Sequence, residues 1–291
     1  MDAAAVPAPA APAPAPAAST AGGGSYRIEV RTVQAVAFKV LVEALKELLT
    51  DTCIEFDETG MKIVAMDTSH VVLVHLKLDA SKFELYQCAA HTTIGVNMLN
   101  LHKLIKTINN SDTLTLFVDA EDMNHLCIKI ENSEKGTKTT YKLNLMDLPN
   151  EKITVDPAEF SSVITLPSSD FQKICRDMQN IAEFMEVKSL GSQLIFSCRG
   201  DFCQQETVLC DTDTSAPGAD GADGADGAAA PPRDAGGIIQ GVFSVKHLVM
   251  FTKCTNLCNQ VQLLLRNDYP LLLVYDVASL GSVRLALAPH V

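Results

Sequence analysis

One pattern of helical spacing occurs twice in this chain of 291 residues, once in each half. In the first copy, apolar residues stand three, four and three positions apart, which places them on one face of a helix. We therefore predict a helix over 34–49, and the same spacing returns 133 positions later in a helix that begins at Ser168. The two sets are Phe38, Leu41, Leu45 and Leu48, and Phe171, Ile174, Met178 and Ile181. Such self-similarity predicts two copies of one structural plan.

A second pair of predicted helices supports the duplication. A helix over 98–108 matches another over 245–253, and Leu101 then corresponds to Leu248 at a displacement of 147 positions. The two displacements differ by 14 positions, and the second half contains a run rich in Gly, Ala and Asp that accounts for the excess. We expect this insert, about residues 212–237, to be a flexible acidic loop.

Short alternating segments surround the predicted helices and indicate antiparallel strands. They cover 26–33, 53–56, 62–66, 71–78, 114–118, 126–131 and 139–145 in the first half, and 163–166, 186–189, 193–198 and 206–210 in the second. The predicted fold class is therefore α+β, with two similar domains.

The domain boundaries follow from composition. Pro149 and Pro157 resist helix and lie between the two halves, so we expect two domains at 26–147 and 161–291 joined by a connector at 148–160. Residues 1–25 are rich in Pro and Ala, contain no basic residue, and are expected to be a disordered tail.

Catalytic and cofactor motifs are absent from the sequence. Nine cysteines form no CxxC pair, seven histidines show no metal-binding spacing, and no glycine-rich nucleotide motif occurs. Asp67, Ser69 and His70 are residue types found in catalytic triads, but neighbours on an extended chain point apart. We therefore expect no catalytic residues, no metal, no cofactor and no enzyme activity. The best apolar run, 261–275, is interrupted by polar residues, so no membrane span is expected.

Basic residues gather on the four predicted helices. The whole chain has a net charge of −12, whereas the four helical segments together carry +3. In each helix the basic pair lies off the apolar stripe, which is the usual position of a solvated face. Recurrence in four helices instead favours one shared basic surface that attracts phosphates without reading bases. The pairs are Lys39 and Lys46, Lys103 and Lys106, Lys173 and Arg176, and Lys246 and Lys253.

From residue 26 to 291 the sequence resembles the family of proliferating cell nuclear antigen, the sliding clamp of eukaryotes and archaea. The resemblance rests on KVLVEALKELL at 39–49, MDTSHVVLV at 66–74, KLNLMDL at 142–148, FQKICRDM at 171–178, MFTK at 250–253 and LAP at 287–289. It implies three subunits joined head to tail in a ring, with helices inside and antiparallel sheets outside. The joint would pair an edge strand near 124–130 with one near 205–210, and the eight basic residues would face the hole.

The same resemblance implies a pocket beside the connector for partner proteins. Such partners insert a short motif, Gln-x-x-aliphatic-x-x-aromatic-aromatic. The corresponding positions here are Met66, His70, Val71, Ile153, Val155, Phe160, Pro270, Leu287, Ala288 and Pro289. Each of these residues also has a plain structural interpretation as core or as a tie between connector and domain.

The implied function is a homotrimeric clamp that encircles double-stranded DNA and tethers DNA polymerase and other replication and repair proteins. An ATP-dependent clamp loader would open and close it, in the nucleus or at the site of viral DNA replication. The alternative is a subunit of a heterotrimeric checkpoint-type clamp, which shares the fold but requires unlike neighbours.

Overall fold

The computed structural model describes residues 26–149, 153, 158–191, 193–210 and 238–290. The expected tail, the acidic insert and Val155 lie outside these residues. The described part contains four α-helices and seventeen strands. The helices are α1 (Ala35–Leu45), α2 (Met98–Ile105), α3 (Ser168–Gln179) and α4 (Val245–Phe251), with short 3₁₀ helices η1 (Ala80–Lys82) and η2 (Thr252–Asn256).

Every strand pair in the described chain is antiparallel, and the strands form three sheets. An eight-stranded central sheet has the order β10 (Ser162–Pro167), β15 (Gln260–Leu265), β16 (Leu271–Val277), β17 (Gly281–Leu287), β4 (Val72–Asp79), β3 (Gly60–Met66), β2 (Asp51–Asp57), β6 (Thr92–Asn97). A five-stranded sheet has the order β5 (Leu85–Cys88), β1 (Tyr26–Thr32), β7 (Asp112–Asp119), β8 (His125–Asn132), β9 (Thr137–Asn144). A four-stranded sheet has the order β13 (Gln204–Leu209), β12 (Gln193–Arg199), β11 (Phe184–Leu190), β14 (Ile239–Ser244).

The element order reveals a repeat half as long as the one that the sequence predicts, so that each half contains two units. A strand, a helix and three strands occur four times, beginning at β1, β6, β10 and β14. Within each half, the first strand of one unit joins the three strands of the other unit: β1 pairs with β7 and β6 with β2, while β10 pairs with β15 and β14 with β11. This exchange ties the two units of each half into one folded body.

The central sheet crosses the boundary between the halves. Strand β17 of the C-terminal half pairs with β4 of the N-terminal half, from Gly281 opposite Leu78 to Leu287 opposite Val72. Alternate residues of these strands, such as Val74 and Leu285, are fully buried. The halves therefore share one sheet and one continuous core.

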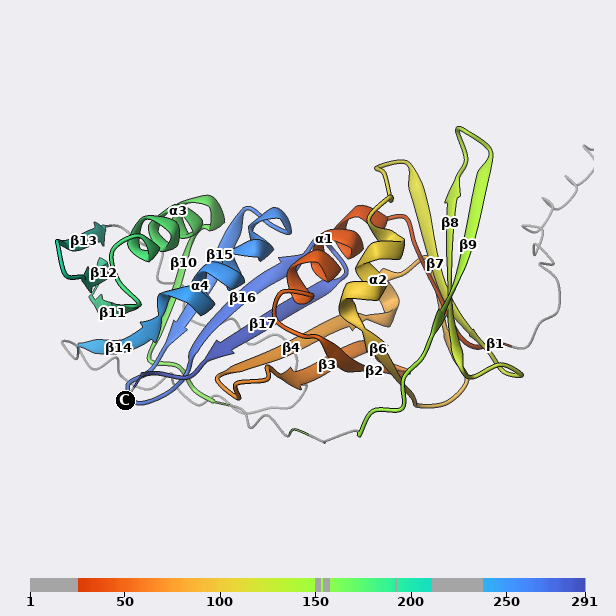
Figure 1. Cartoon of the computed structure of the whole chain (residues 1–291), viewed down its shortest axis with the longest axis horizontal. Coiled ribbons are helices and arrows are strands. Elements are labelled where there is room, and N and C mark those ends of the chain that lie inside the picture. The colour runs from red at the N-terminus through yellow and green to blue at the C-terminus, as the bar shows by residue number, and fades with distance from the viewer. Residues whose placement is uncertain (1–25, 150–152, 154–157, 192, 211–237, 291) are drawn as a thin grey trace, which may run out of the picture.

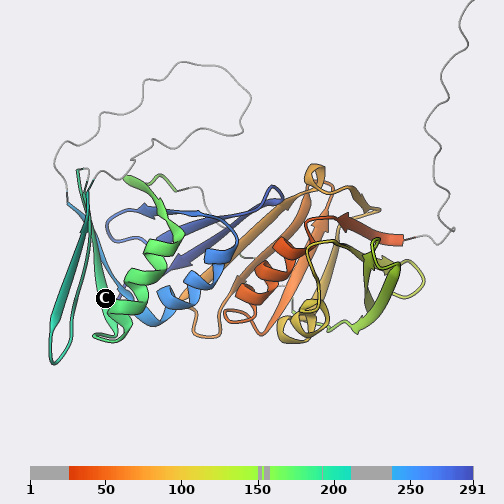
Figure 2. The same cartoon turned by 90° about the horizontal axis from the view of Figure 1, so that it is seen from above.

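All four helices lie in a row along one side of the central sheet, and the two smaller sheets stand at the ends of the molecule (Figures 1 and 2). Helix α1 packs on α2, α3 packs on α4, and η2 contacts both α1 and α3. The predicted apolar faces are buried: Phe38, Leu41 and Leu45 in α1, and the matching residues of α3, lie in the core. The predicted α+β class with two similar halves is confirmed.

Candidate functional site: a helical face and a pocket on the opposite side

The predicted basic residues all lie on or just after the four helices, but they differ in how free they are. Six of them are exposed and make no ion pair within the described residues: Lys103, Lys106, Lys173, Arg176, Lys246 and Lys253. The two on α1 are half-buried and engaged. Lys39 Nζ donates a hydrogen bond of 2.9 Å to the carbonyl of Ile108, and Lys46 Nζ lies 2.6 Å from Glu47 Oε1.

The basic pairs do not occupy equivalent positions in the four helices. The ninth position, counted from the first residue of each helix, is basic in three cases: Lys106 for α2, Arg176 for α3 and Lys253 for α4. In α1 the ninth residue is the acidic Glu43. Since Lys39 and Lys46 sit at the fifth and twelfth positions, α1 departs from the charge pattern of the other three helices. The positive face is therefore uneven, and weakest at α1.

Helices of both halves meet near the end of α1, where α1 contacts α2 and η2. The hydrogen bond from Lys46 lowers the pKa of Glu47 against the opposing effect of burial, and Lys253 and His102 lower it further. Burial lowers the pKa of His102, and the neighbouring Lys46 and Lys106 add to this. Cations of α1, α2 and η2 thus influence the same small region.

Several residues of the predicted peptide pocket lie near the seam between the halves, where β17 pairs with β4. The Ala288 N–H donates to the Val71 carbonyl at 3.0 Å, and Pro270 directly precedes Leu271, which pairs with Leu287. Met66 is 39% exposed, His70 is exposed, and Val71, Ile153, Pro270, Ala288 and Pro289 are half-buried. The structure thus brings Met66, Val71, Ala288 and Pro270 to one region of the seam.

Two aromatic contacts border this region. Phe160 meets Tyr269 edge to face with ring centroids 5.7 Å apart, and the Arg266 guanidinium lies 5.4 Å from the Tyr269 centroid. His290 stacks on Phe184 at 4.0 Å while its N–H donates to the Val242 carbonyl at 2.8 Å. His290 is thereby held against the four-stranded sheet.

One predicted pocket residue faces the wrong way. Leu287 is fully buried, together with Val283 and Leu285 of the same strand, so its side chain offers no surface to a partner. Because side chains alternate along a strand, Ala286 faces outward instead. Register places it in a row across the sheet, which we call the apolar row. Its members are Met66, Leu73, Ala286, Leu272 and Leu264.

The sequence did not single out Leu73, Ala286, Leu272 or Leu264. The alternation within 71–78 was visible, but which alternate set faces the helices depends on long-range strand pairing. Only the four-strand register shows that these residues form a single row.

The loop that carries Met66 to Val71 is held by a carboxylate. Asp67 accepts hydrogen bonds from the N–H groups of Val71 and Val72 at 2.9 and 2.8 Å, and from both the N–H and the hydroxyl of Ser69. Burial acts to raise the pKa of Asp67, but these hydrogen bonds outweigh it and hold the pKa below its usual range. His70, at a positive φ of 56°, makes no side-chain hydrogen bond to the described residues. Asp67 thus fixes the turn, and the Ser69 hydroxyl bonds to Asp67.

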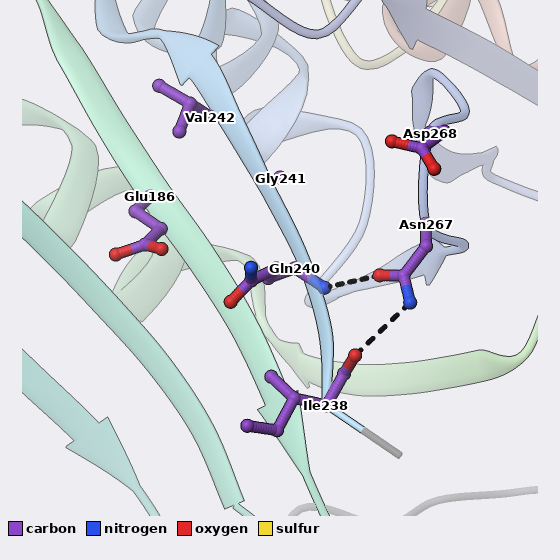
Figure 3. Close-up of a pocket in the computed structure, with 7 residues that line it drawn as sticks. All are labelled: Glu186, Ile238, Gln240, Gly241, Val242, Asn267 and Asp268. Carbon is purple, nitrogen blue, oxygen red and sulfur yellow. Dashed lines mark hydrogen bonds between the residues drawn. The ribbon is translucent and has the colours of Figure 1, made fainter.

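Two hollows among the described residues lie on the C-terminal half. One, of about 370 Å³, lies between β14 and the β15–β16 turn, where the Asn267 side chain accepts from Gln240 N at 2.8 Å and donates to Ile238 O at 3.2 Å (Figure 3). The other, of about 540 Å³, lies over β11–β13 and shares Glu186 and Val242 with the first. Asn267 thus satisfies backbone groups at the edge of the first hollow, which indicates a structural tie.

Within the described ranges, no three His, Cys, Asp or Glu side chains are arranged to hold a metal ion. Among the helices that the structure describes, none has both the length and the apolar character needed to cross a membrane.

Comparison with known proteins identifies the family. The family models for the N-terminal and C-terminal domains of proliferating cell nuclear antigen match residues 27–152 and 154–290. The chain is 33% identical over 264 residues to a probable DNA polymerase sliding clamp of Paramecium bursaria Chlorella virus 1, covering 89% of this chain and 95% of that protein. It is 32% identical over 266 residues to proliferating cell nuclear antigen of Chaetomium thermophilum, covering 91% and 98%. The duplicated fold, the repeated helices and these matches together show that the chain belongs to the proliferating cell nuclear antigen family.

Proposed function

We propose that this protein is a DNA sliding clamp, a ring that encircles duplex DNA and tethers DNA polymerase to it. The observation that carries the proposal is the row of helices that presents six exposed cations, unpaired within the described residues, on a chain with a net charge of −12. Such a surface attracts phosphates independently of base sequence. The printed names of the relatives, a sliding clamp and proliferating cell nuclear antigen, support the same function.

A head-to-tail ring is favoured by one edge strand at each end of the molecule. Strand β9 is the last strand of the five-stranded sheet and β13 the last of the four-stranded sheet, at opposite ends of the molecule (Figure 1). Unpaired edges of this kind invite pairing with another chain. Lys138 and Lys142 lie on β9 and Glu206 lies on β13, and all three are exposed, so the edges are also complementary in charge. Heterologous contacts of this type close into rings when the rotation permits.

The ring joint expected near 124–130 requires a correction. Those residues fall largely on β8, which lies between β7 and β9 and has no free edge. The proposed joint therefore pairs β9, at 137–144, with β13 of the next subunit.

The subunit composition is tested by mass in solution. A homotrimer predicts a particle of three times the 31.3 kDa of one chain at micromolar concentration. A chain that remains a monomer under the same conditions contradicts the homotrimer and favours a subunit of a heterotrimeric checkpoint-type clamp.

We also propose that the seam beside the connector binds partner proteins through a short motif ending in two aromatic residues. The chain supplies Met66, His70, Val71, Ile153, Phe160, Pro270, Ala288 and Pro289, with Val155 outside the described residues, and the apolar row adds outward-facing side chains. Apolar hollows edged by backbone groups suit aromatic anchors.

A labelled peptide carrying this motif tests the pocket. We expect Ile153→Ser combined with Val155→Ser to abolish peptide binding and to leave the particle mass unchanged. Unchanged peptide affinity in this double variant would show that the connector does not form the pocket.

The remaining elements of the proposal follow from the clamp function. An ATP-dependent loader opens the ring, and the protein acts in the nucleus or at a site of viral DNA replication as a tether, without catalytic residues of its own. The two domains are 26–147 and 161–291, joined by the connector at 148–160, and the split between the two family matches falls within that connector.

A further inference from the structure

Four basic side chains gather on the face of the central sheet that points away from the helices. His75 of β4 lies between Val64 of β3 and Arg284 of β17 in the strand register. Two residues along β4, Lys77 lies opposite Lys62 of β3. We call Lys62, His75, Lys77 and Arg284 the basic cluster. It spans the seam between the two halves.

The members of the basic cluster differ in how far they are neutralised. Lys62 Nζ lies 2.7 Å from Asp57 Oδ2, in a close pair. Lys77 pairs loosely with Asp79 at 3.4 Å, and its side chain is 52% exposed. Arg284 is exposed and makes no ion pair with the residues that the structure describes. Arg284 and Lys77 therefore remain available to a ligand.

Three cations of the basic cluster act together on the imidazole of His75. Burial lowers the pKa of the half-buried His75, and Arg284, Lys62 and Lys77 lower it further, since each disfavours a second positive charge. The cluster thus repels cations and attracts carboxylates.

The basic cluster adjoins the apolar row. Leu73 precedes His75 by two residues on β4, and Ala286 follows Arg284 by two residues on β17. Two residues of strand span roughly 7 Å, a distance that an arginine side chain covers. A peptide anchored on the apolar row would thus carry its neighbouring side chains to Arg284.

We propose that the basic cluster binds acidic side chains of partner peptides next to their apolar anchor, so that partners with acidic flanks are selected. This inference rests on the proposed function of the apolar seam as a peptide site. The planar guanidinium of Arg284 holds a carboxylate through two parallel hydrogen bonds, and Lys77 adds a second charge. We favour a peptide over nucleic acid as the ligand because the basic cluster adjoins the apolar row. The cations proposed to contact phosphates lie on the helices, on the opposite side of the central sheet.

Peptides with one common core motif and different flanks test the proposal. Two Glu residues, two Gln residues or two Lys residues are placed next to the core, in separate sets on its N-terminal and C-terminal sides. At low salt, we expect the better Glu-flanked peptide to bind about three- to tenfold more tightly than its Gln partner, and the advantage to shrink as salt screens the charges.

Charge-changing variants test whether the basic cluster causes the preference for Glu-flanked peptides. Arg284→Glu combined with Lys77→Glu should remove or reverse the advantage of Glu flanks, and Arg284→Lys should retain part of it because the charge remains without the planar fork. Lys135→Glu, a charge reversal on the exposed β8–β9 turn, should leave the advantage unchanged.

Three outcomes overturn the proposal. Equal binding of Glu and Gln flanks on both sides shows that the cluster does not select acids, while core-motif binding still supports the pocket. Loss of duplex binding in the double variant, with unchanged peptide preference, assigns the cluster to phosphates. If no core-motif peptide binds, the proposed pocket fails and this inference fails with it.

Discussion

Asp67 and Val72 are joined by two hydrogen bonds in opposite directions. The Asp67 N–H donates to the Val72 carbonyl at 2.9 Å, and the Val72 N–H donates to the Asp67 carboxylate at 2.8 Å. The carboxylate also receives the N–H of Val71. This arrangement closes the loop between β3 and β4 and positions His70 and Val71, two residues of the proposed pocket.

We predict that Asp67→Ala lowers stability by about 1–2 kcal/mol, because backbone N–H groups lose their acceptor. It should also weaken binding of a core-motif peptide, since the loop that carries Met66 and Val71 is no longer positioned. Thermal unfolding and peptide titration measure the two effects. Asp67→Asn, which keeps one acceptor oxygen, should lose less of both, and equal losses in the two variants would contradict this role.

The contribution of Asp67 should depend on pH only in acid. Its pKa in the folded protein is depressed, so its stabilisation is present above the ordinary aspartate pKa of about 3.9 and is lost as pH falls through the lower, folded value. The difference in melting temperature between the wild type and Asp67→Asn should stay constant from about pH 8 to 5 and shrink below about pH 4. A difference that changes near neutral pH would implicate another group.

The charge at the ninth helical position should determine how strongly each helix contributes to DNA binding. Glu43→Lys gives α1 the charge that Lys106, Arg176 and Lys253 give the other three segments. Binding to a short linear duplex should then fall more steeply with salt, by about 0.9 in the logarithmic slope for each new phosphate contact. Arg176→Ala should make the slope shallower, and Lys135→Ala should leave it unchanged. A slope that is indifferent to Glu43→Lys and to Arg176→Ala would place the duplex elsewhere.

The charges on the free edges predict the strength of the ring. Glu206→Lys on β13, or Lys142→Glu on β9, should raise the fraction of monomer at low protein concentration, because like charges then face each other across the joint. Combining both changes should restore part of the trimer. Exposed ion pairs contribute about 0.2–1 kcal/mol, so each joint should weaken a few-fold, most clearly at low salt. Mass measurements over a dilution series test this, and trimers equally stable in all variants would contradict the proposed joint.

Gly95 lies close to the residues at the start of the connector. A Cβ at this position would lie 2.2 Å from the Met146 carbonyl oxygen and 3.0 Å from Leu148 Cγ. Gly95→Ala should therefore displace the first residues of the connector, destabilise the protein by about 1–3 kcal/mol, and reduce peptide binding. Gly136→Ala is the control, since nothing lies within 4 Å of its Cβ. That variant should show only backbone strain and normal peptide binding. Normal peptide binding in Gly95→Ala would separate the connector from the pocket.

The helices could be located from the sequence because their signals are local. The predicted starts at Met98, Ser168 and Val245 agree with α2, α3 and α4, and the Asn97 side chain caps α2 by accepting from Asn100 N. Helix α1 ends at Leu45, before the predicted end, although Leu48 is still buried in the turn that follows. An apolar pattern reports burial, and burial continues past the last helical turn.

Strand pairing could not be predicted because it depends on residues far apart in the chain. The exchange of first strands between units leaves no local trace, and the predicted strands did not include β5, β6 or β14 to β17. Likewise, Leu287 was assigned to the pocket on resemblance alone. A shift of one residue along a strand moves a side chain to the other face of the sheet, and the register of β17 places Leu287 in the core.

Retention on DNA after loading tests the central claim most directly. The protein is loaded by a clamp loader on closed circular DNA, and the amount still bound is measured at high salt before and after the circle is cut once. An encircling clamp should remain on the closed circle, where salt cannot release it, and should leave through the ends of the cut molecule. Equal loss from closed and cut DNA would show that the protein grips the duplex and does not surround it.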